Sequence, residues 1–366
     1  MYCLCTINDK KMLCNNIDLS GKHLLLTGVA GFIGSNLAKN LLSRMPNLTI
    51  IGIDSLNDYY DVRLKQERLS TLKQYSNFIF KEGNIADKSF VDSLFHTFNP
   101  YVVVNLAAQA GVRYSISSPQ SYIESNVIGF FNILEACRHS YDSEAEGVAH
   151  LVYASSSSVY GGNTKIPYST DDKVDTPVSL YAATKKSNEL FAHAYSKLYG
   201  IPSTGLRFFT VYGPCGRPDM AYFSFTDKLK RGEIIKIFNY GNCQRDFTYI
   251  DDIVEGIYRI IHHAPEKVVG EDGLLKAPYK IYNIGNNHPE NLLDFVDILQ
   301  EELVRAGVLP SDFDFESHKQ LVPMQKGDVP ITYADTSELE EDFGFKPTTP
   351  LRVGLRRFAE WYASFY

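Results

Sequence analysis

The chain has 366 residues, 44% of them hydrophobic and 22% charged, which is typical of a globular protein long enough to bury a large core. Its formal net charge of −7 argues against a general nucleic-acid binder, which needs a basic face, but allows a local basic pocket for a phosphorylated ligand. No apolar run has the length of a membrane span, and the first residues lack the apolar core of a secretory signal. We therefore expect a cytoplasmic protein with no membrane or nucleic-acid partner.

Residues 1–20 are predicted to be a poorly ordered leader. Three of the six cysteines lie in this segment, and the other three are scattered along the chain. Since no second pair of ligands stands at zinc-site spacing, we expect reduced thiols and no metal. The cysteines are Cys3, Cys5 and Cys14 in the leader, then Cys137, Cys215 and Cys243.

A glycine-rich segment follows the leader. Residues 24–34, Leu-Leu-Leu-Thr-Gly-Val-Ala-Gly-Phe-Ile-Gly, are typical of a buried strand, a turn and the start of a helix that continues to residue 43. Gly28, Gly31 and Gly34 have the spacing G-x-x-G-x-x-G. Without side chains the backbone of this turn can approach a pyrophosphate, whose charge is favoured at the positive end of the helix. The pattern predicts a dinucleotide cofactor.

The next predicted strand, 49–54, ends in an acid. This residue, Asp54, stands twenty positions after Gly34. A carboxylate at this distance accepts hydrogen bonds from both hydroxyls of an adenosine ribose, and it would repel a 2′-phosphate. The predicted cofactor is therefore NAD rather than NADP.

Helical and extended patterns alternate from there, in the order helix 61–74, strand 77–81, helix 89–98 and strand 101–105. Nearly apolar strands that alternate with helices predict a parallel sheet with right-handed crossovers and helices on both faces. The predicted fold class is α/β, a doubly wound Rossmann sheet that binds ligands at the carboxyl ends of its strands. The pattern continues with helix 121–137, strand 150–154, helix 181–199 and strand 202–207.

The helix 181–199 begins with a tyrosine and a lysine four residues apart, Tyr181 and Lys185, and this spacing places both side chains on one face. A free tyrosine has a pKa of about 10, so it is a poor base at neutral pH unless nearby positive charge, here from Lys185, stabilises its phenolate. The strand 150–154 brings four serines, 155–158, to the same edge of the sheet.

From about residue 208 the composition shifts to Gly, Pro and aromatic residues, and the pattern becomes looser. We expect 21–210 to form mainly the NAD-binding Rossmann domain and 211–366 mainly a smaller, interleaved substrate-binding lobe, with some segments returning to the first domain. Residues 265–280 are predicted to be a polar loop. The elements expected here are helices 223–231, 251–264, 291–306 and 351–366 and strands 234–238 and 247–250.

Together these motifs resemble the extended short-chain dehydrogenase/reductase family of nucleotide-sugar enzymes, over nearly the whole chain after about residue 20. The resemblance also includes residues 105–108, Asn-Leu-Ala-Ala, and the Val-Tyr-Gly at 159–161 that follows the serines. It implies Ser156, twenty-five residues before Tyr181, as the catalytic hydroxyl, with Ser158 as the alternative. The NAD contacts that it implies are Gly28, Gly31, Phe32, Ile33, Gly34, Asp54, Asn57, Asn84, Ile85, Leu106, Ala107, Ala108, Asn126, Tyr181 and Lys185.

Within that family, residues 213–220, Gly-Pro-Cys-Gly-Arg-Pro-Asp-Met, and 110–115, Ala-Gly-Val-Arg-Tyr-Ser, resemble the UDP-glucuronate 4-epimerases. The resemblance implies that Thr210 and Arg217 hold the sugar carboxylate, and a guanidinium fork suits both of its oxygens. Cys215 and Gly216 depart from the bulkier residues usual there. The substrate-binding residues implied are Arg113, Ser156, Ser157, Ser158, Thr210, Arg217, Arg245 at the diphosphate and Asp328 near the uridine ribose.

The serine segment also bears on the reaction. Relatives that dehydrate or decarboxylate the keto-sugar carry an acid in this segment, where this chain has Ser157 and Ser158. Without that acid, the simplest outcome is that the 4-keto sugar turns in the pocket and takes the hydride back on its opposite face. The resemblance thus implies an NAD-dependent isomerase that converts UDP-glucuronate to UDP-galacturonate for polysaccharide biosynthesis.

Other interpretations stay open at this point. The substrate is alternatively UDP-N-acetylglucosaminuronate, UDP-glucose or UDP-N-acetylglucosamine, because tolerance for an N-acetyl group at C2 depends on pocket volume. A non-catalytic NAD-binding sensor or scaffold is disfavoured by the presence of Tyr181, Lys185 and Ser156. The resemblance also implies a homodimer that packs through the helices 121–137 and 181–199.

Overall fold

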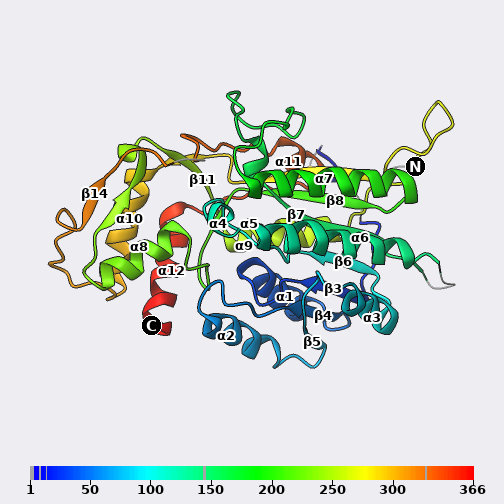
Figure 1. Ribbon diagram of the computed structural model, residues 1–366, viewed down its shortest axis with the longest axis horizontal. Coiled ribbons are helices and arrows are strands. Elements are labelled where there is room, and N and C mark those ends of the chain that lie inside the picture. The colour runs from blue at the N-terminus through cyan, green and yellow to red at the C-terminus, as the bar shows by residue number, and fades with distance from the viewer. Residues whose placement is uncertain (1–3, 8–9, 14, 143–145, 326–327) are drawn as a thin grey trace.

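The computed structural model describes residues 4–7, 10–13, 15–142, 146–325 and 328–366 (Figure 1). A sheet of seven parallel strands lies at its centre, in the order β12-β8-β7-β6-β3-β4-β5. From β3 the chain builds the sheet first in one direction and then, from β6, in the other, so the predicted doubly wound α/β fold is confirmed. The strands are β3 (His23–Thr27), β4 (Thr49–Asp54), β5 (Phe78–Glu82), β6 (Val102–Asn105), β7 (His150–Ser156), β8 (Ser203–Phe208) and β12 (Tyr279–Ile284).

Helices cover both faces of the sheet. Successive side chains of a strand point to opposite faces, so each strand contributes to two cores. Leu24 and Leu26 of β3 belong to one apolar core, and Leu25 between them belongs to a second. Two buried faces explain why the inner strands are apolar along nearly their whole length. The first core contains α1 (Phe32–Arg44) and α9 (Ile250–Ile261), and the second contains α3 (Lys88–Phe98), α6 (Gly129–His139) and α7 (Leu180–Tyr199).

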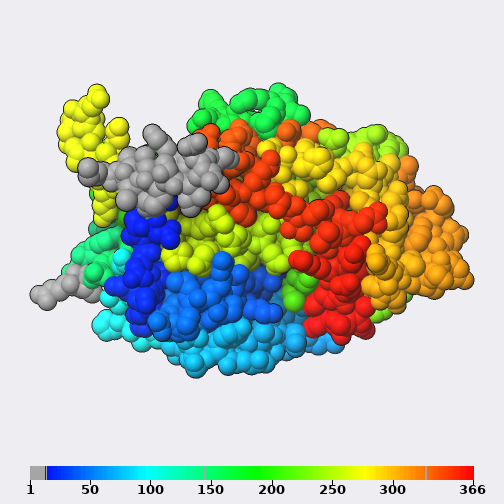
Figure 2. Space-filling model, turned by 180° about the vertical axis from the view of Figure 1, so that it is seen from behind, coloured from blue at the N-terminus to red at the C-terminus, as the bar shows by residue number. Residues whose placement is uncertain are grey.

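Most of the elements after β8 form a smaller lobe at one end of the molecule, where Figure 1 shows α8, α10, α12 and β14 together. The C-terminal helix α12 docks there through the buried side chains of Leu355 and Phe358, and Figure 2 shows it in red beside α10. The lobe contains α8 (Ala221–Lys230), α10 (Leu292–Arg305), α12 (Leu351–Phe365), the sheet of β9 (Thr210–Tyr212), β11 (Gln244–Tyr249) and β13 (Pro289–Asn291), and the pair of β10 (Ile235–Ile237) and β14 (Lys319–Leu321). The shorter elements are α2 (Val62–Leu72), α4 (Tyr114–Ser117), η2 (Ser157–Tyr160), η3 (Phe238–Gly241) and α11 (Ser337–Phe343).

One predicted helix is interrupted. In place of a single helix over 121–137 the structure has α5 (Pro119–Tyr122), a π-helical turn η1 (Ile123–Ile128) and then α6. The interruption lies where the side chain of Asn126 hydrogen-bonds the backbone of Gln109 instead of facing solvent. Hydrophobic periodicity does not reveal such a turn, because its buried residue is the polar Asn126 while the apolar Ile123 and Ile128 are exposed.

The predicted loop over 265–280 ends too late. Residues 279–284 form β12, which pairs with β8 and completes the sheet at its edge. The sequence Tyr-Lys-Ile-Tyr-Asn-Ile alternates only partly, and the neighbouring strand β8 supplies the partner that makes it extended. The strands β9, β13 and β14 and the helix α11 were also not predicted.

The leader needs a correction from about residue 16 onward. Ile17 and Leu19 are buried in the first core, and the backbone N–H groups of Asn16 and Ile17 donate to His262 at the end of α9. These apolar side chains tie the segment to the folded domain, so it does not form a poorly ordered leader. Further upstream β1 (Leu4–Ile7) pairs with β2 (Lys10–Leu13), and residues 1–3, 8–9 and 14 lie outside the described residues, as do Cys3 and Cys14.

Candidate active site

A cavity of about 450 Å³ lies at the carboxyl ends of the central strands, with walls from both the sheet and the lobe. A doubly wound sheet is expected to bind its ligand at this edge. The predicted cofactor residues in its wall are Gly28, Gly31, Phe32, Ile33, Gly34, Asp54, Asn57, Asn84, Ile85, Leu106, Ala107, Ala108, Tyr181 and Lys185. The predicted substrate residues in its wall are Ser156, Ser157, Ser158, Thr210, Arg217, Arg245 and Asp328.

The glycine-rich turn forms a wall of backbone. A Cβ on Gly34 would lie 2.2 Å from the Gly28 carbonyl oxygen, and a Cβ on Gly28 would lie 2.8 Å from the Ala107 nitrogen. Gly28 also has a φ of +70°, which side-chain-bearing residues avoid. Gly31 caps α1 without a side chain, so the N–H groups of the first helical turn are left to bind an anion. This cradle fits the pyrophosphate of a dinucleotide.

Asp54 lies at the end of β4, on the wall of the same cavity. Its Oδ2 accepts a hydrogen bond from the N–H of Ala30 over 3.0 Å, and its Oδ1 accepts one from the N–H of Leu56 over 2.9 Å. These two bonds fix the orientation of the carboxylate, and each oxygen keeps a second lone pair that can accept a ribose hydroxyl. The carboxylate of Asp54 is thus oriented to bind the ribose hydroxyls of NAD.

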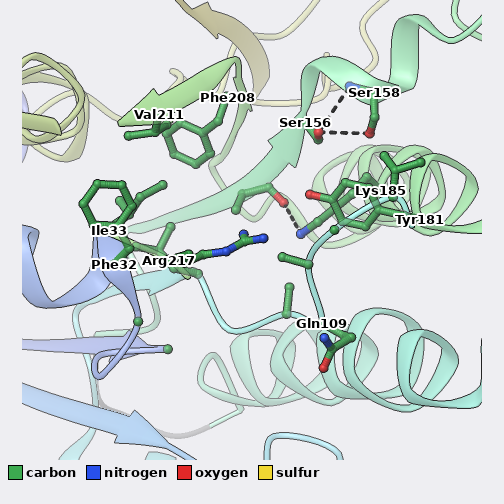
Figure 3. A pocket seen from close by; sticks show the side chains of 18 of the residues that line it. Phe32, Ile33, Gln109, Ser156, Ser158, Tyr181, Lys185, Phe208, Val211 and Arg217 are labelled. Atoms are coloured by element: carbon green, nitrogen blue, oxygen red, sulfur yellow. Dashed lines mark hydrogen bonds between the residues drawn. The ribbon is translucent and has the colours of Figure 1, made fainter. Parts of the chain in front are cut away.

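The side chains of Tyr181 and Lys185 reach the cavity from the first turns of α7, and Ser156 reaches it from the end of β7 (Figure 3). The hydroxyl of Ser156 lies close enough to the phenol of Tyr181 to lower its pKa. The hydroxyl of Ser158 donates to the hydroxyl of Ser156 over 2.9 Å, and the ammonium of Lys185 donates to the carbonyl of Ala154 over 2.9 Å. Of the two serines, Ser156 is therefore the one beside the phenol.

Burial and charge act in opposite directions on this group. Burial raises the pKa of Tyr181, while the hydrogen bond with Ser156 and the positive charge of Arg217 act to lower it. Burial lowers the pKa of Lys185 to about 8. The sequence predicts Lys185 as a cation that stabilises the phenolate, and the structure adds Arg217 as a second positive charge that lowers the pKa of Tyr181.

Arg217 extends into the cavity (Figure 3), and its guanidinium already holds a carboxylate of the chain. Its Nε donates to Asp219 Oδ1 over 3.0 Å and its Nη2 donates to Asp219 Oδ2 over 2.6 Å. The hydroxyl of Tyr59 donates to the same carboxylate over 3.2 Å. Burial raises the pKa of Asp219, but the charge and hydrogen bonds of Arg217 outweigh it, so the net shift of the pKa is downward.

The second predicted anion-binding arginine is paired in a similar way. Arg245 Nη2 donates to Asp328 Oδ1 over 2.7 Å, and Arg245 Nη1 donates to the carbonyl of Pro330 over 3.1 Å. Both members of the ion pair line the cavity, on the side of the lobe. The diphosphate and uridine positions that the resemblance implied are therefore adjacent.

Two predicted residues do not line the cavity. Arg113 is exposed, and its guanidinium lies 5.2 Å from the centre of the Phe238 ring. Asn126 is buried behind the wall, where its side chain bonds the backbone of Gln109 and the hydroxyl of Thr184. Asn126 thus supports the cavity instead of contacting a ligand, because η1 turns its side chain toward Gln109 and α7.

Several residues of the cavity wall were missed. The ammonium of Lys65 donates to the backbone carbonyl and to the side-chain oxygen of Asn57, both over 2.7 Å, which brings a second lysine to the cofactor side. The position of Lys65 on α2, one turn after the helix begins, gave no signal in the sequence. The other missed wall residues include Tyr59, Tyr60, Gln109, Tyr168, Phe208, Phe209, Met220 and Thr332.

Among the described residues, no three His, Cys, Asp or Glu side chains are arranged to hold a metal ion. Across the same residues, every helix is too short or too polar to span a bilayer.

Comparison with known proteins agrees with this geometry. The model of the NAD dependent epimerase/dehydratase family matches residues 24–285. Protein CapI of Staphylococcus aureus is 50% identical over 94% of this chain and 99% of its own length, and UDP-glucuronate 4-epimerase 4 of Arabidopsis thaliana is 45% identical over 95% and 76%. The crystal structure of UDP-glucuronic acid 4-epimerase from Bacillus cereus, in complex with UDP-glucuronic acid and NAD, is 30% identical with a TM-score of 0.79, covering 94% of this chain and 100% of that one. The chain therefore belongs to the NAD dependent epimerase/dehydratase family and is an NAD-dependent nucleotide-sugar 4-epimerase.

Proposed function

We propose that the substrate is UDP-glucuronate and the product UDP-galacturonate. The observation that carries this proposal is the guanidinium of Arg217, which extends into the cavity close enough to Tyr181 to lower its pKa. A guanidinium at that place can bind the carboxylate at C6 while C4 faces the phenol. Relatives named UDP-glucuronate 4-epimerase, and the Bacillus cereus structure with UDP-glucuronic acid, support the same assignment.

The chain's own groups handle the proton of the substrate's C4 hydroxyl. Tyr181 takes this proton as a phenolate and later returns it, and Ser156 hydrogen-bonds the same substrate oxygen. Lys185, held by the Ala154 carbonyl, supplies positive charge at the base of the phenol when it is protonated. When bound, NAD accepts a hydride from the sugar carbon and returns it.

The serine segment limits the reaction to epimerisation. Ser157 and Ser158 line the cavity where relatives that dehydrate or decarboxylate the keto-sugar carry an acid. A hydroxyl does not transfer a proton at a neighbouring carbon as a carboxyl group does. The one reaction left to the keto-sugar is therefore to take the hydride back, on either face of its C4 carbonyl.

The proposal is tested with the purified protein and no added NAD. Incubation with UDP-glucuronate is expected to yield UDP-galacturonate, which NMR detects by the small couplings of its equatorial C4 proton. UDP-N-acetylglucosaminuronate and UDP-glucose are incubated in parallel. If either of these is turned over faster than UDP-glucuronate, that sugar becomes the assigned substrate. If none of the three is turned over, the result favours a non-catalytic NAD-binding sensor.

Arg217→Leu tests the observation itself. We expect the KM for UDP-glucuronate to rise by about tenfold or more, because a charge-assisted pair contributes roughly 1.5–3 kcal/mol. Arg231→Leu is a matched control, since Arg231 pairs with Glu233 two residues on but has an exposed side chain. An unchanged KM in Arg217→Leu would contradict the role of this residue in binding the acid.

The homodimer stays a prediction. On the outer faces of α6 and α7 the apolar side chains of Phe131, Leu190 and Leu198 are 44%, 58% and 71% exposed. A second copy that packs α6 and α7 against the same helices would cover them. Sedimentation equilibrium of wild type and Leu190→Glu distinguishes a dimer through this face from a monomer.

A further inference from the structure

A buried arginine outside the cavity connects its two halves. Arg68 lies on α2 and is 4% exposed. Its Nη1 donates to the carbonyl of Ala30 over 2.8 Å, and its Nη2 donates to the carbonyls of Cys215 over 2.6 Å and Gly216 over 2.9 Å. Within the described residues it forms no ion pair with a carboxylate; its charge is stabilised by these carbonyls and by the hydroxyl of Tyr60, to which Nη1 also donates over 2.8 Å. Burying a guanidinium without a carboxylate partner costs free energy unless its hydrogen bonds to these acceptors are kept.

The carbonyls belong to two segments that are far apart in sequence. Ala30 lies inside the glycine-rich turn that cradles the cofactor, and its N–H also donates to Asp54. Cys215 and Gly216 immediately precede Arg217, the proposed carboxylate-binding residue. One side chain therefore spans the cofactor turn and the turn that presents Arg217.

The second turn has little freedom of its own. Cys215 has a φ of +56°, in the left-handed region that favours glycine. A Cβ on Gly216 would lie 1.9 Å from the hydroxyl oxygen of the buried Tyr222, so a larger residue there would have to displace that side chain. In this backbone conformation the carbonyls of both Cys215 and Gly216 accept hydrogen bonds from Arg68.

We propose that Arg68 is a positioning residue that locks the Arg217 turn to the cofactor turn and thereby sets selectivity for an acidic sugar. Resting on the proposed function, this inference assigns to Arg68 the placement of Arg217 relative to the cofactor. Lysine cannot replace Arg68, because one ammonium does not reach carbonyls on both turns as the guanidinium fork does. Neutral sugars do not need Arg217, so they report on the rest of the site.

The test uses the purified holoprotein with Arg68→Met and Arg68→Lys, the second of which keeps the charge should the first fail to fold. Arg63→Lys is the control, on the same helix but with a side chain 82% exposed. The measurements are the KM for UDP-glucuronate, the inhibition constant of UDP-glucose in the same assay, and the amide hydrogen exchange of residues 213–220. We expect the KM to rise about tenfold, which corresponds to about 1.4 kcal/mol, with an unchanged inhibition constant and faster exchange in 213–220.

The outcomes separate this inference from the proposed function. A parallel rise of both constants, with an unchanged ratio, would mean that Arg68 only supports the fold, and it would overturn the positioning role. If the wild type does not turn over UDP-glucuronate, the proposed function fails while hydrogen exchange still decides on Arg68. In that case, faster exchange confined to 213–220 supports the link between the turns, and exchange equal to that of wild type refutes it.

Discussion

The two halves of the cavity are built from different materials. On the cofactor side the wall is largely backbone, folded so tightly that a Cβ on Gly34 would lie 2.2 Å from the Gly28 carbonyl. On the substrate side the groups proposed to bind the substrate are long charged side chains, Arg217 and Arg245, each paired with an aspartate of the chain. The cofactor side thus has its shape before any ligand binds. On the substrate side the paired aspartates orient the two arginines, and their negative charges also lower the net positive charge that faces the ligand.

Because of this difference, the two halves of the cavity should tolerate different substitutions. Backbone geometry depends on steric fit, so one added methyl group damages the cofactor side. Ion pairs depend on charge and direction, so the substrate side is sensitive to removal of a charge while the fold survives. Four predictions test this contrast, beginning with the group that lies between the two halves.

Tyr181→Phe should lower kcat by roughly 10²–10⁴-fold, the range expected for loss of a general acid–base group. The phenyl ring keeps the packing, so the NAD content of the purified protein should stay equal to that of wild type. Turnover by NMR and NAD released on denaturation are the two measurements. Loss of NAD together with activity would place the phenol in the cofactor half instead of between the halves.

Gly34→Ala should strip the protein of NAD, because the methyl group meets the Gly28 carbonyl oxygen at 2.2 Å. Overpacking of this kind typically costs about 1–3 kcal/mol, so the thermal midpoint should also fall. Gly162→Ala is the matched control, since a Cβ there has its nearest neighbour at 3.5 Å. Retention of full NAD in Gly34→Ala would mean that the turn is less tightly built than its geometry indicates.

Arg245→Leu should raise the KM for UDP-sugars by about tenfold while leaving the NAD content unchanged, since a charged hydrogen-bond donor contributes roughly 1.5–3 kcal/mol. The loss should be equal for acidic and neutral UDP-sugars, because both carry the diphosphate. Steady-state kinetics with both substrates check this. A loss confined to the acidic sugar would move Arg245 from the diphosphate to the carboxylate.

The smallest effect concerns pH. The positive charge of Arg217 lowers the pKa of Tyr181, so Arg217→Gln, which keeps hydrogen-bond capacity but not charge, should raise that pKa. Because the phenolate is the active form, the acidic limb of kcat/KM against pH should move to higher pH. An unmoved limb would assign the control of the phenolate to Lys185 and the cofactor alone.

Much of the sheet was predictable from local pattern. Apolar runs such as 24–26 and 102–104 reflect burial on both faces, and the glycine spacing with Asp54 reflects steric needs of one turn. The strand β12 was missed because its pattern becomes extended only beside β8. The break at η1 was missed because the residue buried there is the polar Asn126, while Ile123 and Ile128 are exposed.

The sequence by itself determined the alternation of strands and helices from β3 to β8, the cofactor turn and the spacing of Tyr181 and Lys185, because these depend on neighbours within about one turn or strand. Only the tertiary structure decided that Ser156 lies beside the phenol, that Arg217 is the cation lowering the pKa of Tyr181, and that Arg68 spans two turns. It also placed Arg113 away from the cavity. The physical reason is that long charged side chains choose partners by distance in space, and segments such as 28–34 and 213–220 meet only when the sheet and the lobe have packed together.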